Sequence, residues 1–195
     1  MLVRKLRDYI VVIIALNALI LVGCGSSDTK YIDSGIEHLV IKAYKLAIDD
    51  FSAAIQENSE NNDAYFLRAY SYYESAATME DIELARNDFT SYIEHYEDAE
   101  LREIKDLNIG ISLDRAYIGR AITYHQNCEA FGDIKSCQMA VDDLVQASRI
   151  SPGSWQVYQT LGIVYETYSQ KSIQGERDGW RDRSIQAYNK ARKLR

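Results

Sequence analysis

Small and large apolar residues recur at helical spacing in four segments of the chain. These segments are 47–54, 85–92, 140–147 and 184–191, and each begins with alanine or serine and places a large apolar residue four positions later. In three of them, alanine follows three positions after that. Spacings of four and three put these residues on one face of a helix. The pattern therefore predicts four amphipathic helices.

A second set of helices is predicted just before each of the first. There, a tyrosine and a small residue stand four positions apart, so that a large ring can lie beside a close approach of two backbones. The pairs are Tyr31–Gly35, Tyr65–Ala69, Tyr117–Ala121 and Tyr158–Gly162. Tyr31 and Tyr65 are 34 residues apart, and a period of this length is the signature of a repeat architecture.

This pattern resembles the tetratricopeptide repeat, a pair of helices with an aromatic and a small residue in the first and Ala, an aromatic and Ala in the second. Ile150-Ser151-Pro152 matches the end of the family's repeat. The resemblance covers residues 28–195. It implies an all-α fold, a right-handed superhelix of about four helix pairs over residues 31–195, with the first helices on a concave wall. Extra residues within repeats two to four, and an extra segment at 100–113, depart from the family, and a generic helical bundle is the alternative.

The start of the chain has the pattern of an export signal. Arg4, Lys5 and Arg7 precede an apolar run from Tyr9 to Val22, and this run is shorter than the ~20 residues that span a bilayer. Leu21-Val22-Gly23-Cys24 resembles the lipobox of bacterial lipoproteins.

The lipobox implies a signal peptide at 1–23, lipidation of Cys24 with fatty acyl chains such as palmitate, and a short tether at 24–30. Gly25, in place of the aspartate that retains many lipoproteins in the inner membrane, favours the periplasmic face of the Gram-negative outer membrane. An ordinary signal peptide or an uncleaved anchor is the alternative.

Two further cysteines, Cys128 and Cys137, flank an insertion from Gln126 to Ser136 that contains Gly132 and can form a turn. In an oxidising compartment such a pair is expected to form a disulfide. A metal site that includes His125 is the weaker interpretation, because no fourth ligand stands at a regular spacing. No cofactor or metal is expected.

The charge of the chain and its lack of catalytic motifs argue against nucleic-acid binding and against catalysis. The net charge of −7 disfavours nucleic acid. Residues 24–170 carry 11 basic and 25 acidic side chains, whereas residues 171–195 carry 8 basic and 3 acidic ones. Neither HExxH, GxSxG nor a Gly-rich phosphate loop occurs. Acidic pairs such as Asp49-Asp50 and Asp142-Asp143 are expected on helix surfaces, so the sequence predicts a protein that is not an enzyme.

The resemblance also implies a binding surface on the first helices of the repeats. Carried onto this chain, the family's ligand-facing positions are Asp63, Phe66, Tyr70, Tyr73, Arg115, Ile118, Ile122, His125, Gln156, Gln159, Ile163 and Glu166. The expected function is a membrane-anchored scaffold or adaptor that recruits or assembles an envelope complex, of the secretin or pilus assembly type or the peptidoglycan-enzyme type. The alternatives are an accessory lipoprotein that carries a small hydrophobic ligand, and self-association through the C-terminal helix.

Overall fold

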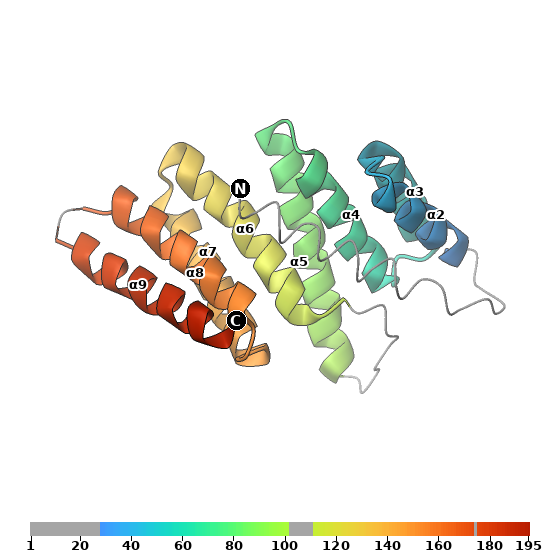
Figure 1. The fold of residues 1–195 in the computed structure, drawn as a ribbon. Coiled ribbons are helices and arrows are strands. Elements are labelled where there is room, and N and C mark those ends of the chain that lie inside the picture. Colours follow the sequence, from blue (N-terminus) through green and yellow to red (C-terminus); the bar gives the residue numbers. More distant parts are fainter. Residues whose placement is uncertain (1–27, 102–110, 174) are drawn as a thin grey trace. The chain divides into compact units, whose positions relative to one another are not determined.

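The computed structural model describes residues 28–101, 111–173 and 175–195, and these residues form eight α-helices and no β-strand (Figure 1). Consecutive helices pack against each other in pairs. The predicted all-α fold of four helix pairs is therefore confirmed. The predicted signal peptide and Cys24 lie outside the described residues. The chain divides into two compact units, one ending at Ser112 and one beginning at Leu113.

The first unit contains α2 (Thr29–Val40), α3 (Tyr44–Glu57), α4 (Asn62–Ser75) and α5 (Met79–Leu101). Helix α3 packs on α2 and α4, and α4 packs on α5. One apolar cluster joins the first three helices, and it consists of Ile32, Ile36, Leu39, Ala47, Phe51, Ala54, Ala64, Leu67 and Tyr70. The first helix pair thus completes its core with residues of α4, which begins the second pair, as expected of stacked repeats.

The second unit contains α6 (Leu113–Phe131), α7 (Ile134–Ile150), α8 (Trp155–Lys171) and α9 (Arg177–Leu194). Helix α8 packs on α6, α7 and α9. The small residues of the repeat pattern, such as Ala121, Ala140 and Ala147, are completely buried. Within the described ranges, no helix combines the length and the apolar character needed to cross a bilayer.

The small residue of the first helix in a repeat has a direct steric role. A Cβ atom added at Gly35 would overlap the ring of Phe51, and one added at Gly162 would lie 2.6 Å from Cδ1 and Cε1 of Tyr188. Phe51 and Tyr188 occupy the large apolar position of the following helix. The paired pattern of tyrosine, glycine and aromatic residue therefore encodes how closely the two helices approach.

The insertion in the third repeat, from Gln126 to Ser136, is mostly helical, and its expected turn takes only two residues. Helix α6 continues to Phe131, and only Gly132 and Asp133 separate it from α7. Gly132 ends α6 with a φ of 67°, a conformation that favours glycine. The Asp133 side chain then accepts a hydrogen bond from the backbone N–H of Lys135 and caps α7. The extra residues lengthen the helices and leave the turn short.

Candidate protein-binding surface

Two of the predicted binding residues on α4 belong to the core. Phe66 is 3% exposed, and its ring packs edge-on against Phe89 at 5.5 Å and Tyr92 at 5.4 Å between centroids. Tyr70 is 5% exposed and lies in the apolar cluster of the first unit. Both residues stabilise the unit and present little ring surface. The family positions predicted for contact with a partner are used here for packing.

Tyr73 and Asp63, the other two predicted residues of α4, are half-buried. Burial, with a smaller contribution from the charge of Glu74, raises the pKa of the Tyr73 hydroxyl above its ordinary value. Tyr73 is therefore a neutral, partly exposed aromatic side chain at neutral pH, and it remains available as a contact residue in the first unit.

In the second unit the predicted residues lie on α6 and α8, which pack directly against each other. Ile118 is 9% exposed and packs in the interior. The partly exposed members of the set on these two helices are Arg115, Ile122, His125, Gln156, Gln159 and Ile163, and Glu166 is exposed. These side chains combine aliphatic groups with hydrogen-bonding groups, which is the composition of a typical protein interface.

Two of these polar residues have structural partners. The ring Nε2 of His125 lies 2.8 Å from Oγ1 of Thr167, which joins α6 to α8. Burial lowers the pKa of His125, although the charge of Glu129 opposes the effect. The Tyr188 hydroxyl donates to Oε2 of Glu166 at 3.1 Å, and burial together with this bond raises the pKa of Tyr188 to about 12. Glu166 therefore links α8 to α9.

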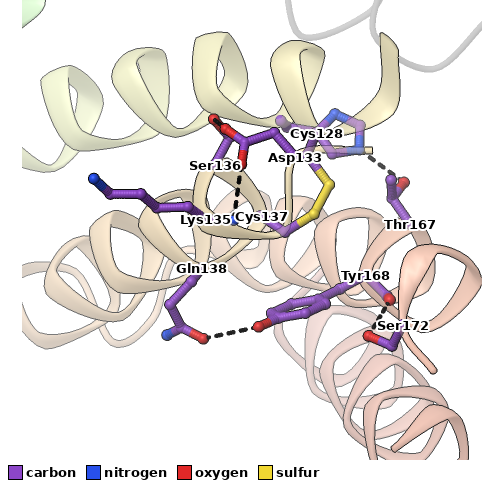
Figure 2. Close-up of a disulfide and its surroundings, with 10 residues drawn as sticks. Cys128, Asp133, Lys135, Ser136, Cys137, Gln138, Thr167, Tyr168 and Ser172 are labelled. Atoms are coloured by element: carbon purple, nitrogen blue, oxygen red, sulfur yellow. Dashed lines mark hydrogen bonds between the residues drawn. A yellow bond between two sulfur atoms is a disulfide. The ribbon is translucent and has the colours of Figure 1, made fainter. Parts of the chain in front are cut away.

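The structure joins Cys128 and Cys137 in a disulfide, with their Cα atoms 5.1 Å apart (Figure 2). The bond connects the last turn of α6 to the first turn of α7, and both cysteines are completely buried. Ser136 Oγ donates to Oδ2 of Asp133 at 2.6 Å in the same turn. Within the residues that the structure describes, no group of three His, Cys, Asp or Glu side chains could hold a metal ion.

Two arginine–aspartate pairs were missed by the sequence analysis. Arg68 on α4 donates through Nε and Nη2 to both carboxylate oxygens of Asp88 on α5, at 2.7 and 2.8 Å. Arg120 on α6 binds Asp143 on α7 in the same way, at 2.9 and 2.8 Å. Asp143 is 6% exposed, so its expected place on the helix surface is wrong.

The pairs follow the repeat. Each arginine stands three residues after the repeat's first tyrosine, and each aspartate directly precedes the large apolar residue of the second helix. In the first repeat the equivalent residues are Ser34 and Asp50, and the serine hydroxyl donates to Oδ2 of this carboxylate at 2.8 Å. The fourth repeat has Leu161 and Ala187 at these positions. The polar link of the first three repeats is thus replaced by two buried apolar residues in the last.

Burial acting alone would lower the pKa of the guanidinium groups in these pairs. The hydrogen bond to the carboxylate and its negative charge outweigh that effect, and the pKa of both Arg68 and Arg120 is raised. Both arginines therefore stay charged, and each bidentate arginine–aspartate pair, here called a fork, holds the two helices of its repeat together.

A row of aromatic and basic side chains joins α8 to α9. The Trp180 ring stacks on Tyr168 at 4.1 Å and 13°, and the Arg183 guanidinium lies 4.4 Å from the Trp180 ring centre. Farther along, Lys190 Nζ donates to the Tyr158 hydroxyl at 2.7 Å. A shallow pocket of about 370 Å³ lies beside Trp180, and its lining consists of Tyr168, Gly175, Glu176, Gly179, Trp180 and Arg183. The basic last segment and its aromatic neighbours were the available sequence signal for this feature.

Comparison with known proteins identifies the fold. No family model matches the sequence, and no curated protein matches it. Among solved structures, a crystal structure of MamA aligns with a TM-score of 0.62 at 15% identity, over 86% of this chain and 78% of that one. A second MamA structure aligns with a TM-score of 0.34 at 14% identity, over 88% and 93% of the two chains, and carries no further argument. At this identity the likeness concerns the fold alone, which is an all-helical solenoid of the tetratricopeptide type.

Proposed function

We propose that this chain is a membrane-anchored scaffold that binds another protein of the bacterial envelope through α6 and α8. The observation that carries this proposal is the set of partly exposed side chains on these two contacting helices, notably Ile122, Gln159 and Ile163. They stand at positions that bind ligands in tetratricopeptide proteins, and part of each side chain remains exposed to solvent. Aliphatic groups beside hydrogen-bonding groups suit a peptide segment of another protein.

The chemistry of this surface favours an apolar segment as the ligand. Tetratricopeptide proteins that grip a C-terminal carboxylate use Lys and Asn at positions that correspond to Ile118, Ile122, Gln159 and Ile163 here. A charged ligand group would find no cation at those positions. An extended or helical segment that inserts an aliphatic side chain between Ile122 and Ile163 is the better fit.

The proposed anchor rests on the Leu21-Val22-Gly23-Cys24 motif. Six residues separate Cys24 from Tyr31, and a fully extended stretch of this length reaches only ~20 Å. Two or three acyl chains hold a protein stably in a bilayer, whereas one chain does not. The repeats would therefore work close to the membrane, where a partner in an envelope assembly, such as a secretin or a peptidoglycan enzyme, is within reach.

In-cell photocrosslinking tests the proposed surface. A photoreactive phenylalanine analogue at Ile163 is expected to capture one dominant protein, and the charge introduced by Ile122→Glu should abolish this capture. The matched control is the same analogue at Gln146, an exposed position of α7 outside the proposed surface. Equal capture from both positions, or capture that persists in Ile122→Glu, would place the partner elsewhere. Substitution of Tyr70 is unsuitable, because this residue is part of the core.

The alternative function is the carriage of a small hydrophobic molecule. The pocket beside Trp180 is the candidate site, but Glu176 and Arg183 form part of its lining, and desolvating these charges would oppose an apolar ligand. Native mass spectrometry of protein purified from its own membrane distinguishes the two functions. A constant added mass in the range of a small molecule would favour carriage, and its absence would favour the scaffold.

A further inference from the structure

The repeat register shows which face of each helix meets the preceding helix pair. Ala64 and Leu67 of α4 are completely buried and belong to the cluster built from α2 and α3. The residues 34 positions earlier, Lys30 and Asp33, occupy the same face of α2 and are exposed. Because α2 begins the described repeats, the face that α4 uses for packing is left uncovered on α2 in the described part of the chain.

The same uncovered face continues along α2. Ser71 is completely buried on α4, whereas Glu37, at the equivalent position of α2, is exposed. One turn further, Val40 is 45% exposed. This face of α2 therefore carries one ammonium group, Lys30, and two carboxylates, Asp33 and Glu37, so it is acidic on balance and ends in an exposed aliphatic side chain.

On α9, the uncovered face is the one that would pack against a following helix pair. In α3, Tyr44 and Ile55 pack against the cluster that α4 enters, and the Tyr44 hydroxyl donates to Glu74 of α4 at 3.4 Å. The repeat alignment of Ala47 with Ser184 places Arg181 and Arg192 at these positions of α9, where both are exposed.

A third position on α9 supports this register. Val141 of α7 is 5% exposed, whereas its equivalent on α9, Ile185, is 51% exposed. The face of α9 that would receive a following helix pair therefore carries two arginines and an exposed isoleucine.

The two faces are complementary in charge. None of the described ion pairs or hydrogen bonds involves the side chains of Asp33, Glu37, Arg181 or Arg192. From Arg183 to its end at Leu194, α9 contains four basic and no acidic side chains. An acidic helix would therefore neutralise α9, and a basic one would neutralise α2.

We propose that copies of this chain associate head to tail, with α2 of one copy packed on α9 of another in the way that α4 packs on α3. In this register, Arg181 takes the place of Tyr44 and lies by Val40, one turn from Glu37, while Arg192 lies toward Asp33 and Ile185 adds apolar contact. The contact joins two different surfaces and is therefore heterologous, so that each copy can bind one neighbour at each end. This inference goes beyond the proposed function and does not depend on the α6–α8 surface.

A second copy is a better occupant than an acidic membrane lipid. Lipid headgroups could neutralise Arg181 and Arg192, but they would leave Asp33 and Glu37 facing water with no partner. Only a second copy satisfies both faces by one contact, and it supplies the helix-to-helix geometry that the repeats already use.

Charge reversal at each face tests the proposal. Full-length protein would be studied by light scattering in a large excess of non-ionic detergent, so that two anchors rarely share a micelle. Wild type should associate with increasing concentration, and Arg181→Glu/Arg192→Glu and Asp33→Arg/Glu37→Arg should each weaken association tenfold or more. An equal mixture of the two variants should associate again, because each reversed face then meets an opposite charge. Raising the salt concentration should weaken the wild-type contact.

Lys193→Glu is the matched control, because it changes the charge of α9 outside the proposed contact and should leave association unchanged. A wild-type protein that stays monomeric at its highest soluble concentration would overturn the proposal. Variants that associate as wild type does, or a mixture that fails to associate, would overturn it as well. Binding of the wild type to anionic vesicles without self-association would assign α9 to lipid instead. Partner capture at Ile163 is measured separately, so that failure of one proposal does not imply failure of the other.

Discussion

At the scale of single residues, the two arginine–aspartate pairs each join a guanidinium group to a buried carboxylate by two hydrogen bonds. Asp88 is 6% exposed and accepts two hydrogen bonds from Arg68. Removing one partner of a buried ion pair leaves the other charge desolvated and unpaired. We expect Asp88→Ala to lower the free energy of unfolding by about 3 kcal/mol, measured by urea denaturation.

The matched double variant separates the ion pair from the packing. Replacing both partners with apolar residues, as in Arg68→Met/Asp88→Leu, removes the desolvated charges together and should restore most of the lost stability. A loss below about 1 kcal/mol in Asp88→Ala would mean that water replaces the carboxylate at no cost, as at exposed ion pairs.

His125 gives the second unit a dependence on pH. Burial lowers the pKa of its ring below the ordinary value of 6.5, so the unfolded chain binds a proton at a higher pH than the folded chain does. The stabilising effect is complete above the unfolded-state pKa and decreases as the pH falls below it. We expect acidification below pH 6.5 to destabilise the protein, and His125→Gln to flatten this part of a plot of melting temperature against pH. An unchanged slope in the variant would assign the effect to other groups.

The burial of Asp143 was missed because it depends on a residue of another helix. Asp142 and Asp143 are adjacent and chemically identical, yet only Asp143 lies on the face that contains Ala140 and Ala147 and meets Arg120. The partner is 23 residues away, so the burial of this carboxylate depends on a neighbouring helix. The recurrence of Arg68 and Arg120 three residues after a tyrosine was the signal that could have revealed both forks.

At the scale of helices, the approach of α8 to α9 depends on a single glycine. A Cβ atom at Gly162 would lie 2.6 Å from the Tyr188 ring, whereas one at Gly179 of α9 would meet nothing within 4 Å. We expect Gly162→Ala to destabilise the protein by about 1–3 kcal/mol through overpacking. Gly179→Ala should be neutral or stabilising by up to about 1 kcal/mol, because alanine favours the helix. Thermal denaturation of both variants checks this difference, and equal effects would contradict the steric role of Gly162.

Most helices were predictable from periodicity, because the apolar spacing that defines a helical face also defines what is buried. Ala47 and Phe51 were placed in this way and are completely buried. The insertions were harder, since added residues can either form a loop or extend a helix by further turns. Gly132, with its positive φ, was the one residue of that insertion that marked the real turn.

At the scale of the whole molecule, the 34-residue period predicted the fold class but not the use of each surface position. Family positions assume that the first helix presents its side chains to a ligand. Here Phe66 instead packs against Phe89 and Tyr92, aromatic residues of α5 whose size fills the space beneath it. Whether such a ring faces a partner or the core depends on the neighbouring helix, and periodicity within one helix does not contain that information.

The membrane anchor is the prediction that decides where the whole molecule works. Cys24→Ala removes the thiol that the lipobox resemblance identifies as the acylated group, so the variant should fail to incorporate radiolabelled palmitate. Loss of the acyl chains also removes the hydrophobic free energy that holds the protein in a bilayer, about 0.8 kcal/mol for each buried methylene. Ser26→Ala, two residues away, should keep both the label and the membrane fraction after a high-salt wash. If Cys24→Ala retained the label, acylation would lie elsewhere; if wild type carried no label, the apolar run of residues 9–22 would be the remaining candidate for the anchor.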